Sequence, residues 1–285
     1  VGMTLVIATR GIDLSVGAVI AICGAVAAAA ITSGHSLIAT LALALVVGLA
    51  CGLWNGFLVS VLNIQPIVAT LVLMVAGRGI AQLITGGFIL TFDDDGLIFV
   101  GSGSAFSLPM PVVIWVLFGL AVTLLVRKTA LGLLIEAVGV NRQASMLSGV
   151  KTTVLLIAVY VLSGLCAAIA GLIVAADIKG ADANNAGLWL ELDAILAVVV
   201  GGNSLLGGRF SIVGSLLGAM IIQAVNTGIL TSGFPPEYNL IIKAVIIVAI
   251  LIIQSPRMSD ITHFFRSRQS KAAQPTAEGT REQPR

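Results

Sequence analysis

Few residues in this 285-residue sequence have the types and spacing that chemistry requires. A catalytic or metal site needs acids, bases, nucleophiles or ligands that converge on one point. No Cys/His group has the spacing of a zinc site, and neither a G-x-S-x-G nor an H-E-x-x-H motif occurs. We interpret the cysteines as small apolar residues of packed helices, and the sequence predicts neither an enzyme nor a metal site. The scattered residues are His35, His263, Cys23, Cys51 and Cys166.

A glycine-rich segment, GGNSLLGG at 201–208, is the nearest approach to a nucleotide-binding loop. It is followed by Arg209 and lacks the Lys-Ser/Thr pair that contacts phosphates in a Walker A motif. We therefore expect that this chain does not hydrolyse ATP and has no cofactor of its own.

Polar side chains inside apolar stretches can serve two purposes. Polar groups in lipid must find partners, so each either bonds a neighbouring helix or lines a watery passage for a hydroxyl-rich solute. Arg78 raises the same question, since its guanidinium can line a path, snorkel to an interface or pair with backbone carbonyls. No pair of carboxylates that could relay protons is present in these stretches, which disfavours a proton-driven carrier. The candidates for a solute path are Asn55, Arg78, Gln82, Gln223 and Asn226.

The composition indicates which elements position these residues. Of all residues, 58% are hydrophobic and 10% are charged, and the mean hydropathy is +1.10. A soluble domain carries about 25% charged residues. The apolar runs are continuous and about 20 residues long, the length of a helix that crosses the hydrocarbon core. They lack the period-two alternation of a membrane barrel. The sequence therefore predicts an all-α fold, a polytopic integral membrane helical bundle.

The expected spans lie within residues 1–254. Val1–Thr9 is only half a helix long, so we expect the sequence to lack at least one preceding span. Asp13 is expected to cap a helix that starts at Leu14, because its carboxylate can accept bonds from early backbone N–H groups. The expected spans are Val1–Thr9 (partial), Leu14–Thr32, Leu37–Leu62, Pro66–Thr85, Met110–Val126, Thr153–Ala176, Glu191–Gly201 (short), Ser211–Leu230 and Asn239–Gln254.

Charge separates along these spans. Cytoplasmic loops of membrane proteins carry the excess of Lys and Arg. The central loop, residues 127–152, and the C-terminus are therefore expected to be cytoplasmic, and the loops Gly86–Pro109 and Asp177–Leu190 to be external. The basic side collects Arg10, Arg127, Lys128, Arg142, Lys151, Arg209, Arg257, Arg266, Arg268 and Lys271, and the other side Lys179, Asp93, Asp94, Asp95, Asp177, Asp182 and Glu237.

The short segment Glu191–Gly201 leaves two interpretations open. With the glycine-rich segment after it, this stretch is either a broken helix that lines a pathway or a plain tight turn between two helices. The charge separation requires that it cross, or nearly cross, the membrane. GIDLSVGAVIA at 11–21 also resembles GRFSIVGSLLGAM at 208–220, which suggests a faint internal repeat.

The chain changes character at its C-terminal end. We predict one transmembrane domain over residues 1–256 and a cytoplasmic tail over residues 257–285. Pro256 ends the last helix. The basic stretch Arg257–Lys271, with Phe264 and Phe265, is suited to lie on the anionic inner leaflet of the membrane. Residues 272–285 have a disordered composition.

The segment Arg127–Lys151 is the longest polar, basic stretch between two strongly apolar ones. It carries Glu136 in an amphipathic pattern that is interrupted at Gly139–Asn141. Such a loop is suited to binding a soluble motor subunit, which would move a membrane channel through it. A carrier that works without an ATPase has no need of it.

Several segments resemble the permease subunits of bacterial sugar ABC importers of the ribose/xylose/galactoside type. GIDLSVG at 11–17 resembles the signature of that family, and PIVATLVLMVAGRGIAQLITGG, AVGVNRQASMLSGV and ELDAILAVVVGGNSLLGG resemble further family motifs in the same order. GLWNG, residues 162–195 and TGILTSGFPPE are most similar to the galactofuranose branch. The resemblance covers essentially the whole chain except the tail. Arg10 departs from it, because the family usually has Gly there, and Ser145 replaces the second Ala of an A-A pair.

The resemblance implies the ABC importer permease fold in the bacterial cell inner membrane. The implied partners are cytoplasmic ABC ATPase subunits that bind the ATP and Mg, a periplasmic sugar-binding protein, and a second permease that is identical or paralogous. No nucleic acid is expected as a partner. The resemblance also implies that residues 136–149 form the coupling helix that docks on the ATPase. The coupling candidates are Glu136, Ala137, Gly139, Asn141, Ala144 and Gly149.

We expect a non-catalytic subunit that translocates a monosaccharide, with galactofuranose or galactose favoured. Ribose or another sugar is an alternative. A secondary carrier or facilitator that needs no ATPase is an alternative from a different class.

Overall fold

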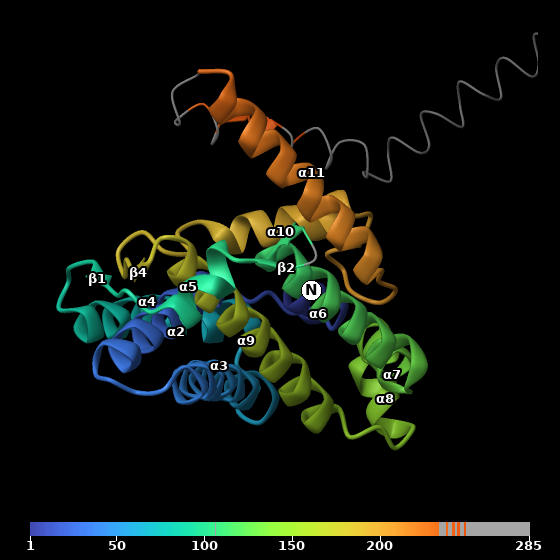
Figure 1. Cartoon of the computed structure of the whole chain (residues 1–285). Coiled ribbons are helices and arrows are strands. Elements are labelled where there is room, and N and C mark those ends of the chain that lie inside the picture. Colours follow the sequence, from blue (N-terminus) through green and yellow to red (C-terminus); the bar gives the residue numbers. More distant parts are fainter. Residues whose placement is uncertain (106, 234–237, 239–240, 243, 246–247, 249–285) are drawn as a thin grey trace, which may run out of the picture. The chain divides into compact units, whose positions relative to one another are not determined.

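A computed structural model describes residues 1–105, 107–233, 238, 241–242, 244–245 and 248 (Figure 1). The chain divides into two units, Val1–Val225 and Asn226–Arg285. The predicted boundary at 256/257 lies outside the described residues. The helices are α1 (Gly2–Ala8), α2 (Val16–Thr32), α3 (Leu37–Ser60), α4 (Pro66–Thr85), α5 (Asp95–Ser102), α6 (Met110–Lys128), α7 (Leu131–Val140), α8 (Arg142–Leu147), α9 (Thr152–Asp177), α10 (Leu190–Val200) and α11 (Ile212–Thr231). These helices belong to the first unit, apart from the last residues of α11, which belong to the second.

The predicted all-helical membrane fold is confirmed. Five of the described helices, α3, α4, α6, α9 and α11, are long and apolar enough to cross a membrane. Strand structure among the described residues is confined to two-residue pieces, β1 (Leu90–Thr91), β2 (Ser104–Ala105), β3 (Leu108–Pro109) and β4 (Gly180–Ala181). The predicted span Pro66–Thr85 coincides with α4, and the other expected spans up to Leu230 agree with helices to within about two residues. The span expected at 239–254 falls largely outside the described residues.

Helix α9 is the centre of the first unit and packs against α1, α2, α3 and α5. Its contact with α3 depends on glycines. A Cβ at Gly52 would overlap the Tyr160 carbonyl, and a Cβ at Gly164 would overlap the Gly48 carbonyl. Gly48, Gly52 and Gly56 recur every four residues, so they share one face of α3. In lipid, where helices gain no hydrophobic energy from associating, such small residues permit the close backbone contact that holds a pair together.

The chain is interrupted between α1 and α2, at Thr9–Ser15. Thr70 of α4 satisfies the backbone there, because its Oγ1 accepts from the Leu14 N–H at 3.1 Å and lies 3.2 Å from the Ile12 carbonyl, to which it can donate. Helix α2 begins at Val16 with Ser15 at its N-cap position. The expectation that Asp13 caps a helix from Leu14 is therefore wrong.

The Asp13 carboxylate instead holds the interruption against a distant helix. Its Oδ1 accepts from the Ser15 N–H and the Ser15 hydroxyl at 3.0 and 2.6 Å, and its Oδ2 accepts from the Ser163 hydroxyl of α9 at 2.8 Å. Asn55 of α3 donates its Nδ2 to the Ser15 hydroxyl at 2.8 Å. These four side chains are buried, and they connect three helices around the interruption.

A second interruption, Gly201–Ser211, separates α10 from α11. Asn203 holds it, since its Nδ2 donates to the Val198 carbonyl and the Ser215 hydroxyl at 3.0 and 2.9 Å, and its Oδ1 accepts from the Ser211 N–H. The two interruptions meet, because Arg10 Nε donates to the Leu206 carbonyl at 2.9 Å. The Gly208 N–H also donates to the Ala8 carbonyl, at the end of α1, at 2.9 Å. The segments that resemble each other in sequence therefore belong to neighbouring interruptions.

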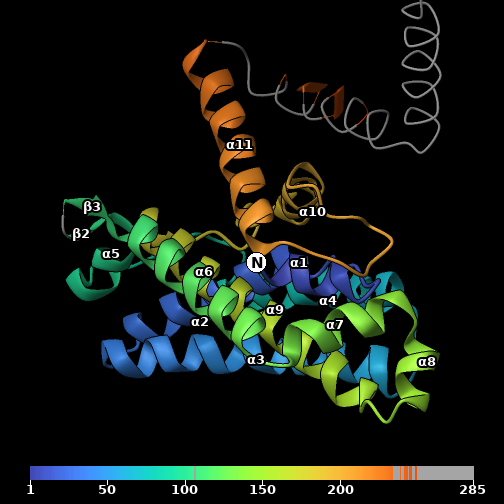
Figure 2. The ribbon, with the colours of Figure 1, turned by 90° about the vertical axis from the view of Figure 1, so that its right-hand side faces the viewer.

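The two ends of the first unit are distinct. Strand β1 pairs with β4, with Leu90 opposite Ala181, and this pairing joins the two loops that the charge pattern assigned to one side. Helices α7 and α8 lie at the end opposite α5 (Figures 1 and 2). The predicted basic loop and the predicted acidic loops are thus at opposite ends.

The contact between α3 and α9 predicts the effect of one added methyl group. In Gly52→Ala, the new Cβ has to displace backbone of α9, and overpacking of this kind costs about 1–3 kcal/mol. The matched control is Gly79→Ala on α4, where a Cβ meets open space. We expect a lower thermal midpoint in detergent for Gly52→Ala and no decrease for Gly79→Ala. Equal midpoints would contradict this account of the contact.

The Asp13 network predicts a selective loss of folded protein. Asp13→Ala leaves three donors without their acceptor, and each unmade buried hydrogen bond costs about 1–3 kcal/mol. The control is Asp93→Ala, which removes the same carboxylate from an exposed position. We expect the yield of monodisperse protein from membranes to fall sharply for Asp13→Ala alone. A normal yield would show that the network is dispensable for folding.

Candidate functional site

The predicted coupling segment forms two short helices that meet at Asn141. Helix α7 ends at Val140, and Asn141 caps α8 by accepting the Ala144 N–H on its Oδ1 at 3.0 Å. The helix break that the Gly139–Asn141 pattern indicates is therefore present. Its cause is the Asn side chain, which replaces a backbone partner at the start of α8.

Helix α8 presents apolar side chains outward. Leu147 is 91% exposed and Met146 is 55% exposed, although both are large and apolar. Ala144 and Gly149 are also exposed, and Gly149 has φ +87°, in the left-handed turn after α8. A short helix with exposed large apolar residues at the end of a membrane protein is suited to insertion into the groove of a partner.

Gly139 is the point at which α7 touches the end of α1 and the second interruption. A Cβ there would overlap the Ala8 carbonyl and would lie 2.6 Å from the Gly208 nitrogen. Ala8 ends α1, and Gly208 belongs to the Gly201–Ser211 interruption. Glycine is required because the backbones of three segments meet within van der Waals distance, and this contact makes the end of α7 a junction.

Glu136 does not project freely from α7. It is half-buried and, with Arg127 at the end of α6, lines a cavity of about 390 Å³. Phe210 and Ser211 of the second interruption form another wall. Ala137, one residue along, is exposed. The cavity opens beside the junction and combines a carboxyl group, a guanidinium and hydroxyl groups.

At the opposite end, Arg78 and Gln82 of α4 hold the loop between β4 and α10. Arg78 Nη1 donates to the carbonyls of Ala183 and Ala186 at 3.1 and 2.5 Å. Gln82 Nε2 donates to the Asn184 side-chain oxygen at 2.8 Å. Of the roles that the sequence left open for Arg78, pairing with backbone carbonyls is the one observed.

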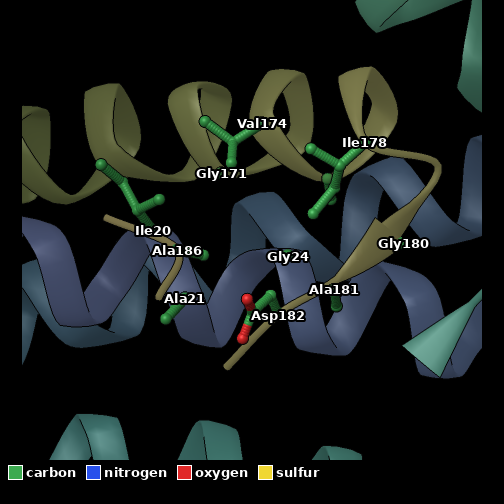
Figure 3. A pocket seen from close by; sticks show the side chains of 11 residues that line it. Ile20, Ala21, Gly24, Gly171, Val174, Ile178, Gly180, Ala181, Asp182 and Ala186 are labelled. Atoms are coloured by element: carbon green, nitrogen blue, oxygen red, sulfur yellow. The ribbon is translucent and has the colours of Figure 1, made fainter. Parts of the chain in front are cut away.

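The loop itself is folded around Asp182. Its carboxylate accepts from Asn185 Nδ2 at 2.7 Å and from the Asn184 and Asn185 N–H groups. These bonds, led by the Asn185 side chain, lower the pKa of Asp182. Asp182 borders a cavity where the strand β4 crosses α2 at Ala21 and Gly24 (Figure 3). The cavity holds only about 10 Å³, so it admits one water at most and no sugar.

The other solute-path candidates of the first unit, Asn55 and Gln223, do not bond this loop. Asn55 is buried in the Asp13 network, and its Oδ1 has no partner. Gln223 is exposed on α11, and Asn226 begins the second unit. The structure therefore brings Arg78 and Gln82 together on one loop and joins neither Asn55 nor Gln223 to them.

Two residues that position the site were missed by sequence reasoning. Asn203 is the one polar amide in a glycine-rich segment between apolar helices, and that isolation was an available signal. Thr70 gave no signal, because a Thr in an apolar helix ordinarily bonds its own backbone. Within the described residues, no group of three or more His, Cys, Asp and Glu side chains could hold a metal ion.

Comparison with known proteins gives related permeases. The chain is 62% identical over 268 residues to the galactofuranose transporter permease protein YtfT of Escherichia coli (strain K12). The aligned region covers 94% of this chain and 79% of that protein. It is 42% identical over 280 residues to the fructose import permease protein FruF of Bifidobacterium longum (strain NCC 2705), covering 97% and 79%. It is 40% identical over 261 residues to the ribose import permease protein RbsC of Escherichia coli (strain K12), covering 90% and 81%. No solved structure matches.

The family match is equally extensive. Residues 1–251 match the family described as branched-chain amino acid transport system / permease component. That range contains both interruptions, α7 and α8, and all the described helices. The chain therefore belongs to this family of transport-system permease components.

Proposed function

We propose that the chain is the permease subunit of an ATP-driven importer that carries a monosaccharide, galactofuranose or galactose, across the bacterial inner membrane. The chain is a multi-pass protein of that membrane. The observation that carries the mechanism is the junction at Gly139, where a helix pair suited to a partner touches the end of α1 and the second interruption. The 62% identity to a galactofuranose permease supports the choice of sugar. The fructose and ribose permeases among the relatives make other sugars the alternative.

In this proposal the partner at α7 and α8 is a cytoplasmic ABC ATPase. Leu147 and Met146 enter its groove, and the cavity beside Glu136 receives one of its side chains. This orientation makes the C-terminus cytoplasmic, as the distribution of Lys and Arg supports. A periplasmic sugar-binding protein delivers the solute at the end where β1 pairs with β4. A second permease, identical or paralogous, completes the passage.

The coupling follows from contact. When ATP binding moves α7 and α8, the C-terminal end of α7 displaces the end of α1 and the Gly201–Ser211 segment. Interrupted helices are the parts of a membrane protein whose backbone can line a path and change direction. The solute has only to bind one access state better than the other for closure and release to be coupled. Arg78 and Gln82 hold the external loop and so set its position at the entrance.

The first experiment distinguishes ATP coupling from a carrier. Uptake of labelled galactose is measured in cells that express the complete importer, with a protonophore present and ATP maintained. We expect uptake to survive in the wild type. It should be lost in Glu136→Arg, which reverses a charge in the cavity, and in Gly139→Trp, which separates the three backbones.

The matched control is Leu117→Trp, an equally bulky residue at an exposed apolar position of α6. It should transport normally, and all variants are to be quantified in the membrane. Uptake that is abolished by the protonophore and indifferent to the junction variants would replace the ABC mechanism with a secondary carrier.

A second experiment tests the docking surface. Leu147→Asp removes an apolar side chain whose burial contributes about 1.5–3 kcal/mol. We expect the affinity of the purified permease for its ATPase, measured by fluorescence titration, to fall about tenfold or more. Ser148→Asp adds the same charge to the next residue and removes no apolar surface, so its effect should be much smaller. Equal losses for both would mean that charge, and not apolar contact, governs docking at α8.

A further inference from the structure

Arg10 has an unusual backbone conformation for its residue type. It follows the end of α1 with φ +63°, in the left-handed region. The Arg10 N–H donates to the Ile7 carbonyl and the Gly11 N–H to the Val6 carbonyl, each at 2.9 Å, which ends the helix in a turn where glycine is usual. An arginine at this position costs backbone free energy that glycine does not. The contacts of its side chain offset that cost.

The side chain joins two segments to which its backbone does not belong. Nε donates to the Leu206 carbonyl at 2.9 Å, and Nη2 donates to the Val140 carbonyl at 2.8 Å. The aliphatic part lies on Gly207, where a Cβ would come to 2.5 Å from Arg10 Cγ. The Val140 carbonyl is at the C-terminal end of α7, where the helix dipole places partial negative charge, so a guanidinium is favoured there.

The bond to Val140 differs in kind from the other contacts of α7 at the junction. The contact of Gly139 with Ala8 and Gly208 is steric, and such a contact resists approach but not separation. The bond from Gly208 to Ala8 joins the second interruption to the end of α1 and leaves out α7. Among the hydrogen bonds described for residues 1–225, the bond from Arg10 to Val140 is the one that joins α7 to the interruptions.

We propose that Arg10 is a positioning residue that fastens α7 to both interruptions. Through this bond α7 transmits movement away from the interruptions as well as movement towards them. This inference rests on the proposed docking of an ATPase at α7 and α8. The guanidinium suits the task because its planar fork holds two carbonyls at once, which a lysine ammonium on a flexible stem does much less well. Glycine at this position would relieve the backbone and forfeit the fastening.

The test uses the complete importer in liposomes, with the ATPase and binding protein present, and measures galactose transported per ATP hydrolysed. For Arg10→Gly we expect this ratio to fall several-fold while the thermal midpoint stays equal or rises, because the left-handed turn is relieved. Arg10→Lys should retain an intermediate ratio. The control is Ser107→Gly, which relieves the same backbone conformation (φ +63°) in the turn between β2 and β3 and should leave the ratio unchanged.

A second measurement requires no ATPase. Spin labels at the exposed positions Ala137 and Leu205 report the distance between α7 and the second interruption in the permease alone. The three native cysteines are first replaced by alanine. We expect one narrow distance distribution in this background and a broader one when Arg10→Gly is added.

Failure of the Arg10 role and failure of the proposed function give different results. An unchanged ratio in Arg10→Gly, or a ratio that falls only in proportion to a lowered midpoint, would overturn the fastening role. An unchanged distance distribution would also overturn it. If the wild-type importer shows no ATP-dependent transport, the proposed function fails first, and the distance measurement still reports whether Arg10 holds the junction.

Discussion

A backbone that leaves the helical conformation inside a membrane exposes polar groups that lipid does not satisfy. This chain does so twice, at Thr9–Ser15 and at Gly201–Ser211, and much of the remaining structure serves to satisfy the groups that are released. Thr70 bonds the Leu14 N–H and lies within reach of the Ile12 carbonyl, and Asn203 does the same for the second interruption. The interruptions persist because each has a specific polar partner for its backbone.

Close helix packing is what brings those partners within reach. Hydrogen bonds of about 3 Å between α2, α3 and α9 require backbones that approach closely, and the glycines of α3 and α9 permit this. The same principle recurs at Gly139, where three backbones meet. Stability and the proposed coupling therefore depend on the same property, the absence of side chains at a few positions, although they use it at different places in the molecule.

The sequence was sufficient for the helices and for the existence of the α7–α8 pair, since continuous apolar runs and a Gly–Asn break are local signals. Contacts between distant residues were not predictable in this way. Asp13 was expected to act on its own helix, but its partner Ser163 lies 150 residues away and no local pattern identifies it. Arg78 offered several roles that differ only in which groups surround the guanidinium, and that is decided by the fold of a loop 105 residues further along.

The separation between Asp13 and Ser163 has a consequence for how the protein is made. A ribosome adds roughly 5–20 residues per second, so Ser163 emerges about 8–30 s after Asp13. During that interval the first interruption has entered the membrane, or waits beside it, with its carboxylate held by Ser15 alone. Helix α1 likewise awaits α9 and α10, against which it packs. The contacts that hold the first interruption and α1 in place are therefore completed only once α9 has been synthesised.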